Sequence, residues 1–122
     1  MLTLSTLPKT WIFDIDGTIV KHNGYLIDGY DTLLDGVKET FEKISREDTI
    51  ILLTARKDEY IEDLKQFLIN NSIRYNYLLN NVPVGERILI NDKKPSGLIT
   101  AYVINKNRDD KLNIEYKIDN NI

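Results

Sequence analysis

The stretch Trp11-Ile12-Phe13-Asp14-Ile15-Asp16-Gly17-Thr18-Ile19-Val20 decides the fold that we expect for this chain. Its first half is aromatic and β-branched and almost continuously apolar, which predicts a buried strand over residues 11–15. Asp14 and Asp16 come where this strand should end. Ligands bind at the carboxyl ends of strands in open α/β sheets, so we predict that the two carboxylates belong to a functional site.

The simpler interpretation of the same stretch is a strand followed by a turn at Asp16-Gly17. A turn accounts for Asp16 but not for Asp14, which is a carboxylate within an otherwise apolar strand. Burying a carboxylate without a partner is costly. A bound cation or a role in chemistry is therefore the favoured explanation for Asp14.

The composition is that of one globular domain spanning residues 1–122, with 42% hydrophobic and 29% charged residues. The net charge of −3 gives no electrostatic reason to expect nucleic acid as a partner. The absence of cysteine excludes disulfides and thiolate chemistry and fits a cytoplasmic location. We expect neither a signal peptide nor a membrane partner, because no apolar run is long enough to span a bilayer.

Apolar periodicity and turn residues predict alternating strands and helices along the rest of the chain. We expect helices at residues 35–45 and 58–70, and further strands at residues 49–54, 75–79, 87–90, 98–104 and 113–118. This alternation predicts a mainly parallel sheet in a three-layer α/β fold. The last two strands are expected to form an antiparallel hairpin at the sheet edge. Residues 21–34 are expected to form a small hairpin or flap.

Polar residues end three of the predicted strands: Asp14 and Asp16 the first, Thr54 the second, and Asn91 and Asp92 the fourth. Parallel strands bring their carboxyl ends to one edge, so these side chains can converge. The set suits phosphoryl transfer, which needs a nucleophile, a group that handles the leaving-group proton and a hard cation. Mg²⁺ prefers such oxygen ligands.

The run Asp14-Ile15-Asp16-Gly17-Thr18 resembles the signature of the haloacid dehalogenase-like phosphatases. This resemblance implies a Rossmann-like α/β/α fold, with Asp14 as the nucleophile and Asp16 as the general acid/base. It also implies that both residues hold Mg²⁺, Asp16 through its backbone carbonyl.

Later residues extend the resemblance. Thr54 is similar to the second motif of the family, which hydrogen-bonds the phosphoryl oxygens. Ala55-Arg56 occurs in some members, where Arg56 is either a substrate contact or a surface residue. Asn91-Asp92 resembles the acidic fourth motif, with Asn in place of the usual first acid. Either of these two residues is a candidate metal ligand.

The third motif of the family places a Lys or Arg near the nucleophile to balance negative charge, and this sequence has several candidates for it. Arg87, just before the fourth predicted strand, is the first choice, and Lys93 and Lys94 are the alternatives, although a surface role fits each of them equally well. His22 is expected to be solvated rather than to contact substrate. The expected substrate contacts are Gly17, Thr18, Ala55, Arg56 and Lys93.

The gaps between the motifs hold no inserted domain, so the resemblance implies a small capless member. We expect a Mg²⁺-dependent phosphomonoesterase with an aspartyl-phosphate intermediate. By analogy its substrate is a phosphorylated sugar or a sugar-linked intermediate of bacterial surface polysaccharide (capsule) biosynthesis. The alternatives are a nucleotidase and a non-catalytic phosphate-binding domain. Without a cap, either a large substrate or a second subunit of a homo-oligomer has to complete the site.

Overall fold

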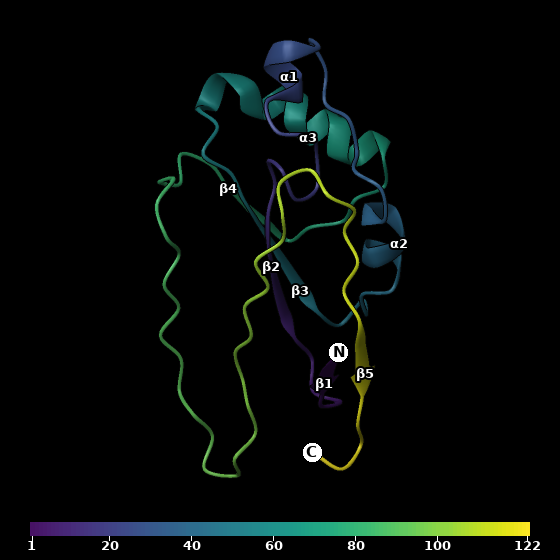
Figure 1. Ribbon diagram of the computed structural model, residues 1–122, viewed down its shortest axis with the longest axis vertical. Coiled ribbons are helices and arrows are strands. Elements are labelled where there is room, and N and C mark those ends of the chain that lie inside the picture. Colours follow the sequence, from purple (N-terminus) through teal and green to yellow (C-terminus); the bar gives the residue numbers. More distant parts are fainter.

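The structure is a computed structural model that describes all residues from 1 to 122, and it shows an α/β protein with two small parallel sheets (Figure 1). One sheet has the strand order β2-β3-β4 and the other pairs β1 with β5. The strands are β1 (Leu2–Leu4), β2 (Thr10–Asp14), β3 (Thr49–Leu53), β4 (Tyr77–Leu79) and β5 (Tyr116–Ile118). The helices are α1 (Gly24–Ile27), α2 (Val37–Glu42), the 3₁₀ helix η1 (Asp58–Tyr60) and α3 (Ile61–Asn70).

Helical connections join the three parallel strands, as the alternating sequence pattern requires. The chain passes from β2 through α1 and α2 to β3, and then through η1 and α3 to β4. Alternate residues of β3 are buried, and α3 buries its apolar stripe at Ile61, Leu64 and Leu68. None of the helices combines the length and the apolar character needed to cross a lipid bilayer.

The hydrophobic core lies between the central sheet and the helices. Phe13 of β2 packs on Phe41 of α2 with 4.7 Å between the ring centroids. Burying each large apolar side chain contributes about 1.5–3 kcal/mol, so this core dominates the stability of the domain. The buried hydrophobic cluster consists of Phe13, Ile15, Ile19, Val20, Val37, Phe41, Ile44, Ile50, Leu52, Ile61, Leu64, Leu68, Ile73 and Leu112.

The predicted flap, residues 21–34, is present, with a helical tip in place of a plain hairpin. Its base is closed by an antiparallel bridge between Val20 and Leu33. The backbone N–H of Lys21 also donates to the carbonyl of Thr32 at 2.9 Å. Between these ends the chain forms α1.

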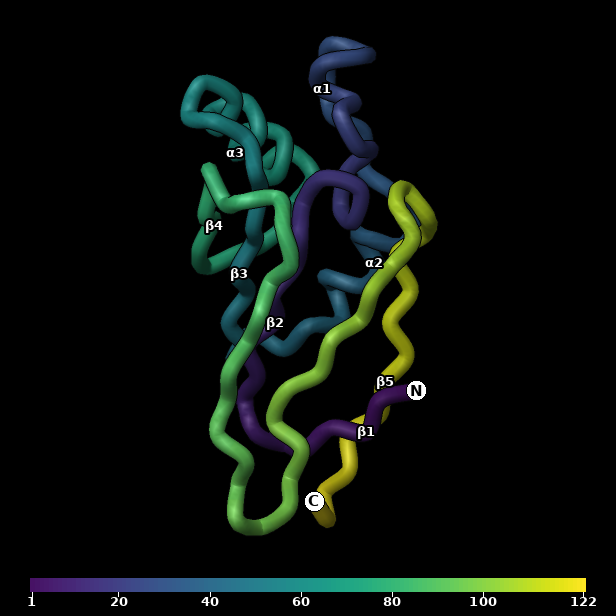
Figure 2. Tube along the Cα trace, turned by 60° about the vertical axis from the view of Figure 1, so that its left-hand side comes forward, coloured from purple at the N-terminus to yellow at the C-terminus, as the bar shows by residue number.

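The predicted strands at residues 87–90 and 98–104 are wrong, because no ladder forms there. Residues 83–106, here called the arm, run out from the sheet and back past the chain termini (Figures 1 and 2). Within the arm one backbone hydrogen bond forms, from the N–H of Gly97 to the carbonyl of Lys94. A strand exists through pairing with a neighbour, and the apolar content of a segment cannot supply that neighbour.

The predicted C-terminal hairpin is also wrong. Residues Tyr116–Ile118 do form a strand, β5, but it pairs in parallel with β1. The antiparallel partner expected at residues 98–104 belongs to the unpaired arm. Two sheets of three and two strands therefore replace the single larger sheet that the sequence predicted.

After the arm, the chain returns to the loop that follows β2. The N–H of Asp109 donates to the carbonyl of Gly17 at 2.9 Å, and the N–H of Leu112 donates to the carbonyl of Asp35 at 2.9 Å. Leu112 is buried in the core. Gly36, at the start of α2, lies directly under the Leu112 backbone with φ of +82°. This close backbone approach explains why the position is a glycine.

We predict that Gly36→Ala destabilises the protein by about 2–5 kcal/mol. Its Cβ would overlap the carbonyl oxygen of Leu112, and alanine is also strained at positive φ. Urea denaturation measures the loss. Gly29→Ala is the matched control, because Gly29 has φ of +83° but no atom near its added Cβ. It should cost about 1–2 kcal/mol. Equal losses in the two variants would contradict the proposed clash.

Candidate functional site

The two carboxylates of the opening stretch lie together at the carboxyl end of β2. Asp14 is the last residue of β2, and it pairs in register with Leu53 of β3. Fully buried Ile15 continues along β3, donating its N–H to the carbonyl of Leu53 at 2.9 Å. The chain then turns tightly, and Gly17 adopts φ of +87°. The turn keeps Asp16 at the same sheet edge as Asp14.

Asp14 is the more accessible of the two carboxylates, with one third of its side chain (33%) exposed. Its Oδ1 accepts a hydrogen bond from Arg87 Nη1 at 3.1 Å, and its Oδ2 accepts one from the Thr18 hydroxyl at 3.2 Å. Burial raises the pKa of Asp14, and the nearby Arg87 and Thr18 offset only part of that rise. Asp14 thus presents an accessible carboxylate with a cation beside it.

Asp16 is held more tightly, and both of its carboxylate oxygens have partners. The Thr54 hydroxyl donates to Oδ2 at 2.6 Å, while Arg56 donates to Oδ1 from Nε at 3.0 Å and from Nη2 at 2.8 Å. Thr54 is fully buried just after β3, and its oxygen accepts the N–H of Arg56 at 3.1 Å. The structure therefore brings Thr54 to Asp16, as the parallel pairing predicted, and it also places Arg56 there.

Arg56 is buried, so the surface role considered for it is wrong. It bonds a second carboxylate, Asp31 of the flap, from Nη1 at 3.0 Å and from Nη2 at 2.7 Å. The Tyr25 ring lies 3.7 Å from the guanidinium carbon, in a cation–π arrangement. Burial lowers the pKa of Arg56, but the hydrogen bonds to Asp31 and Asp16 outweigh it and leave that pKa raised.

Sequence reasoning missed two acidic residues at this site. Asp31 lies in a polar segment that carries no motif, and only the flap fold brings it to Arg56. Asp109 accepts a hydrogen bond from the backbone N–H of His22 at 2.7 Å across 87 positions of sequence. The Arg108 side chain beside Asp109 also lies close to Gly17. No local pattern could have indicated these contacts.

The structure does not bring Asn91 and Asp92 to Asp14 and Asp16. The Asn91 amide donates to the Thr100 hydroxyl at 2.9 Å, and the Asp92 carbonyl accepts from that hydroxyl at 3.0 Å, both within the arm. The reason is that no strand forms at residues 87–90 to carry them to the sheet edge. This geometry gives no support to their predicted role as metal ligands.

Among the three candidate cations, Arg87 is the one that contacts Asp14. Lys93 and Lys94 are exposed in the arm and form no ion pair. Ala55 is half-buried between Thr54 and Arg56.

Two groups at this edge could hold Mg²⁺: the carboxylate of Asp14 and the backbone carbonyl of Asp16, which accepts no hydrogen bond. No group of three acidic or histidine side chains forms a larger metal cluster. Mg²⁺ is usually bound through one or two carboxylates and completes its shell with waters and substrate phosphate. The residues present fit such a cation, with fewer protein ligands than the sequence predicted.

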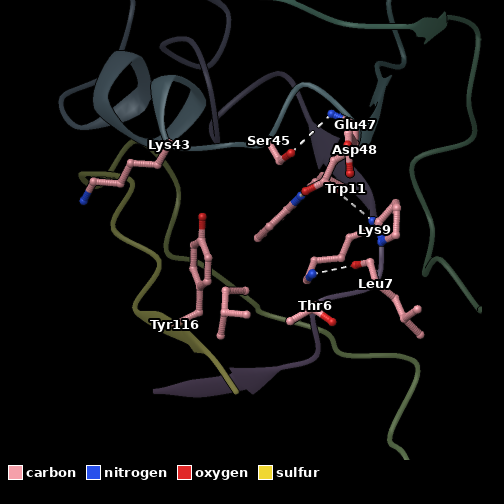
Figure 3. Close-up of a pocket in the computed structure, with 11 residues that line it drawn as sticks. Thr6, Leu7, Lys9, Trp11, Lys43, Ser45, Glu47, Asp48 and Tyr116 are labelled. Carbon is pink, nitrogen blue, oxygen red and sulfur yellow. Dashed lines mark hydrogen bonds between the residues drawn. The ribbon is translucent and has the colours of Figure 1, made fainter. Parts of the chain in front are cut away.

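A surface cavity of about 350 Å³ lies near the amino end of β2, and neither Asp14 nor Asp16 lines it (Figure 3). Its wall includes Trp11, whose indole N–H donates to Asp48 Oδ2 at 2.9 Å. Asp48 Oδ1 accepts the backbone N–H of Lys9 at 2.9 Å. Tyr116 of β5 lies 5.4 Å from the Trp11 ring, so this region joins the two sheets.

Comparison with known proteins finds a similar solved structure. No family model and no curated protein matches the chain. A chain in the solved structure of a Pnkp1/Rnl/Hen1 complex is similar, with a TM-score of 0.53 and 29% sequence identity. The match covers 68% of this chain and 31% of that one, so this chain spans about a third of the similar protein's length. The likeness supports the α/β fold described above.

We predict that Arg87→Gln raises the pKa of Asp14 further, because it removes the cation that opposes the effect of burial. Titrating the carboxyl carbon by ¹³C NMR in the presence of a chelator measures the change. Lys93→Gln is the control, since it removes a charge from the same arm without touching Asp14. An unchanged Asp14 pKa in Arg87→Gln, or an equal rise in both variants, would contradict this role of Arg87.

Proposed function

We propose that this chain is a Mg²⁺-dependent phosphomonoesterase that works through an aspartyl-phosphate on Asp14. One observation carries the proposal: the carboxylate of Asp14 is accessible and paired with Arg87, while that of Asp16, two residues on, is held by Thr54 and Arg56. Two carboxylates in such different surroundings are suited to different roles in one reaction.

In the proposed reaction an oxygen of Asp14 attacks phosphorus, and the bond from phosphorus to the ester oxygen breaks. Asp16 gives its proton to the departing alkoxide and then accepts a proton from the water that hydrolyses the aspartyl-phosphate. Arg87, beside Asp14, offsets negative charge on the phosphoryl group. Mg²⁺, held by the Asp14 carboxylate and the Asp16 carbonyl, would supply further charge neutralisation when bound.

The hydrogen bonds at Asp16 place a condition on this mechanism. The Thr54 hydroxyl donates a hydrogen bond to one Asp16 carboxylate oxygen, and Arg56 donates to the other. Asp16 must therefore turn one oxygen away from these partners to protonate a leaving group. Thr54 becomes free to donate to a phosphoryl oxygen in the same rearrangement, and that contact stays a prediction.

The resemblance to haloacid dehalogenase-like phosphatases supports a substrate class as part of this proposal. On that analogy the chain is a small capless, cytoplasmic member with a three-layer fold, acting on a phosphorylated sugar or a sugar-linked intermediate of bacterial surface polysaccharide. The flap is short, with a four-residue helix at its tip, which fits a substrate that covers the site with its own body or a second subunit that completes it.

A phosphate-binding domain without turnover is the second candidate, and the position of Asn91 and Asp92 favours it. With both residues in the arm, Asp14 has no second acidic side chain beside it other than the tightly held Asp16. A nucleotidase is less well supported. The Tyr25 ring, which could have stacked on a base, is covered by Arg56 and contacts Tyr60 with 5.0 Å between centroids.

We predict that Asp14→Asn lowers kcat at least about a thousandfold, because the amide is not a nucleophile. Asp16→Asn should lower kcat about 100-fold or more on alkyl phosphates and less on para-nitrophenyl phosphate, whose leaving group needs little protonation. A screen of phosphate esters with Mg²⁺ supplies the substrate for these assays. Asp63→Asn, an exposed carboxylate on α3, is the control and should match the native rate.

Trapping the intermediate separates the two candidate functions. An enzyme of the proposed kind accumulates a phosphoryl group on Asp14 in the Asp16→Asn variant, which mass spectrometry detects after acid quench. A phosphate-binding domain would instead bind inorganic phosphate and release none from any ester. Near-native rates for pure Asp14→Asn protein would exclude the covalent mechanism.

We predict that removing divalent cations with a chelator abolishes turnover and that added Mg²⁺ restores it. The reason is that the carboxylate of Asp14 and the phosphate ester repel each other, and Arg87 alone opposes this repulsion beside Asp14. Initial rates across a Mg²⁺ titration give the measurement, and a Zn²⁺ titration is the control for metal selectivity. Full turnover after exhaustive chelation would show that the residues act without a metal.

A further inference from the structure

Arg56 is shared between the candidate site and the flap. Its side chain is 2% exposed, and it pairs with two carboxylates, those of Asp16 and Asp31. Asp16 belongs to the site, whereas Asp31 follows α1 in the flap. Arg56, in the loop after β3, therefore bonds both the proposed general acid/base and the flap.

The bonding around Arg56 leaves it little freedom. Nε and Nη2 donate to Asp16, while Nη1 and Nη2 donate to Asp31, all at distances from 2.7 to 3.0 Å. Charge-assisted bonds of this kind are short, strong and directional. A guanidinium is planar and rigid, so fixing its Nη1 side also fixes its Nε side. The Tyr25 ring of α1 packs against the guanidinium as well.

We infer that Asp31 is a positioning residue for Asp16, which it orients through Arg56, and that the position of the flap and the orientation of the Asp16 carboxylate are coupled. This inference rests on the proposed function, in which Asp16 handles the leaving-group proton. When the flap moves away, Arg56 loses its bonds to Asp31 and its contact with Tyr25, and Asp16 loses a fixed partner. The coupling is reciprocal, so loosening Asp16 also loosens the flap.

The choice of variant follows from the charges. Arg56 carries one positive charge between two carboxylates, and removing it would leave the nearly buried Asp31 and the partly buried Asp16 without their shared cation, which threatens folding. Asp31→Asn instead removes one of the two carboxylates and leaves the hydrogen bonds from Arg56 to Asp16 in place. Asp28→Asn is the matched control, because Asp28 is a flap carboxylate that pairs with Lys21 at 2.9 Å and does not touch Arg56.

The first experiment compares the rates for substrates with different leaving groups. Asp31→Asn should lower kcat/KM about tenfold on an alkyl phosphate, which needs a proton from Asp16, and less than twofold on para-nitrophenyl phosphate. Asp28→Asn should lower neither rate by more than about twofold. A merely structural role of Asp31 would reduce both substrates equally, and that result would overturn the inference.

The second experiment does not depend on enzyme activity. Hydrogen exchange of the flap amides, residues 24–32, should speed up several-fold in Asp16→Asn as well as in Asp31→Asn, with no comparable change in the amides of α3. Asp63→Asn should leave flap exchange unchanged. Unchanged flap exchange in Asp16→Asn would overturn the coupling.

The two experiments also separate failure of this inference from failure of the proposed function. If no phosphate ester is turned over, the proposed function fails, and flap exchange still decides whether Asp16 and the flap are coupled. If esters are turned over but flap exchange does not respond to Asp16→Asn, the phosphatase proposal stands and the coupling is rejected.

Discussion

The register of β2 against β3 is the constraint on which the site depends. In this parallel pairing Asp14 lies opposite Leu53, so the residues after each strand, Asp16 and Thr54, meet in a 2.6 Å hydrogen bond. A slip by one residue would turn every side chain of a strand to the other face of the sheet. Phe13 would then leave the core and the Asp16–Thr54 bond would be lost. Core packing and site geometry are therefore consequences of the same pairing.

The charges at the site are arranged as two separate groups. Asp14 pairs with Arg87 near solvent, whereas Asp16 and Asp31 share the buried Arg56. Exposed ion pairs are weak and exchange easily, but a buried charge that loses its partner is costly. Asp14 can thus exchange Arg87 for a metal cation at low cost. Asp16 changes partners only if its whole buried group rearranges.

The two arginines lie in segments with different amounts of backbone hydrogen bonding. Arg56 follows directly after the β3 ladder, while Arg87 belongs to residues 83–106, which form one backbone hydrogen bond among themselves. Few backbone bonds and many exposed side chains are the features of a segment with low local stability. The cation beside Asp14 is therefore carried on a weakly held segment, and the cation beside Asp16 on a rigid one.

The sequence by itself determined the local elements of the site. An aromatic and apolar run over residues 11–15 and a second apolar run over 49–54 predicted β2 and β3, because a buried parallel strand needs continuous apolar residues. The positions of Asp14, Asp16 and Thr54 at one edge followed from parallel pairing alone. Arg87 was the first candidate for the cation that the family resemblance implies near Asp14, and in the structure it contacts Asp14.

Only the tertiary structure decided the rest, because those features depend on partners distant in sequence. The apolar pattern at residues 87–104 could not reveal that no strand pairs with it, so Asn91 and Asp92 stay in the arm. Asp31 carries no signal until the flap fold places it on Arg56. The parallel pairing of β5 with β1 joins the two ends of the chain, and no local propensity encodes such a contact.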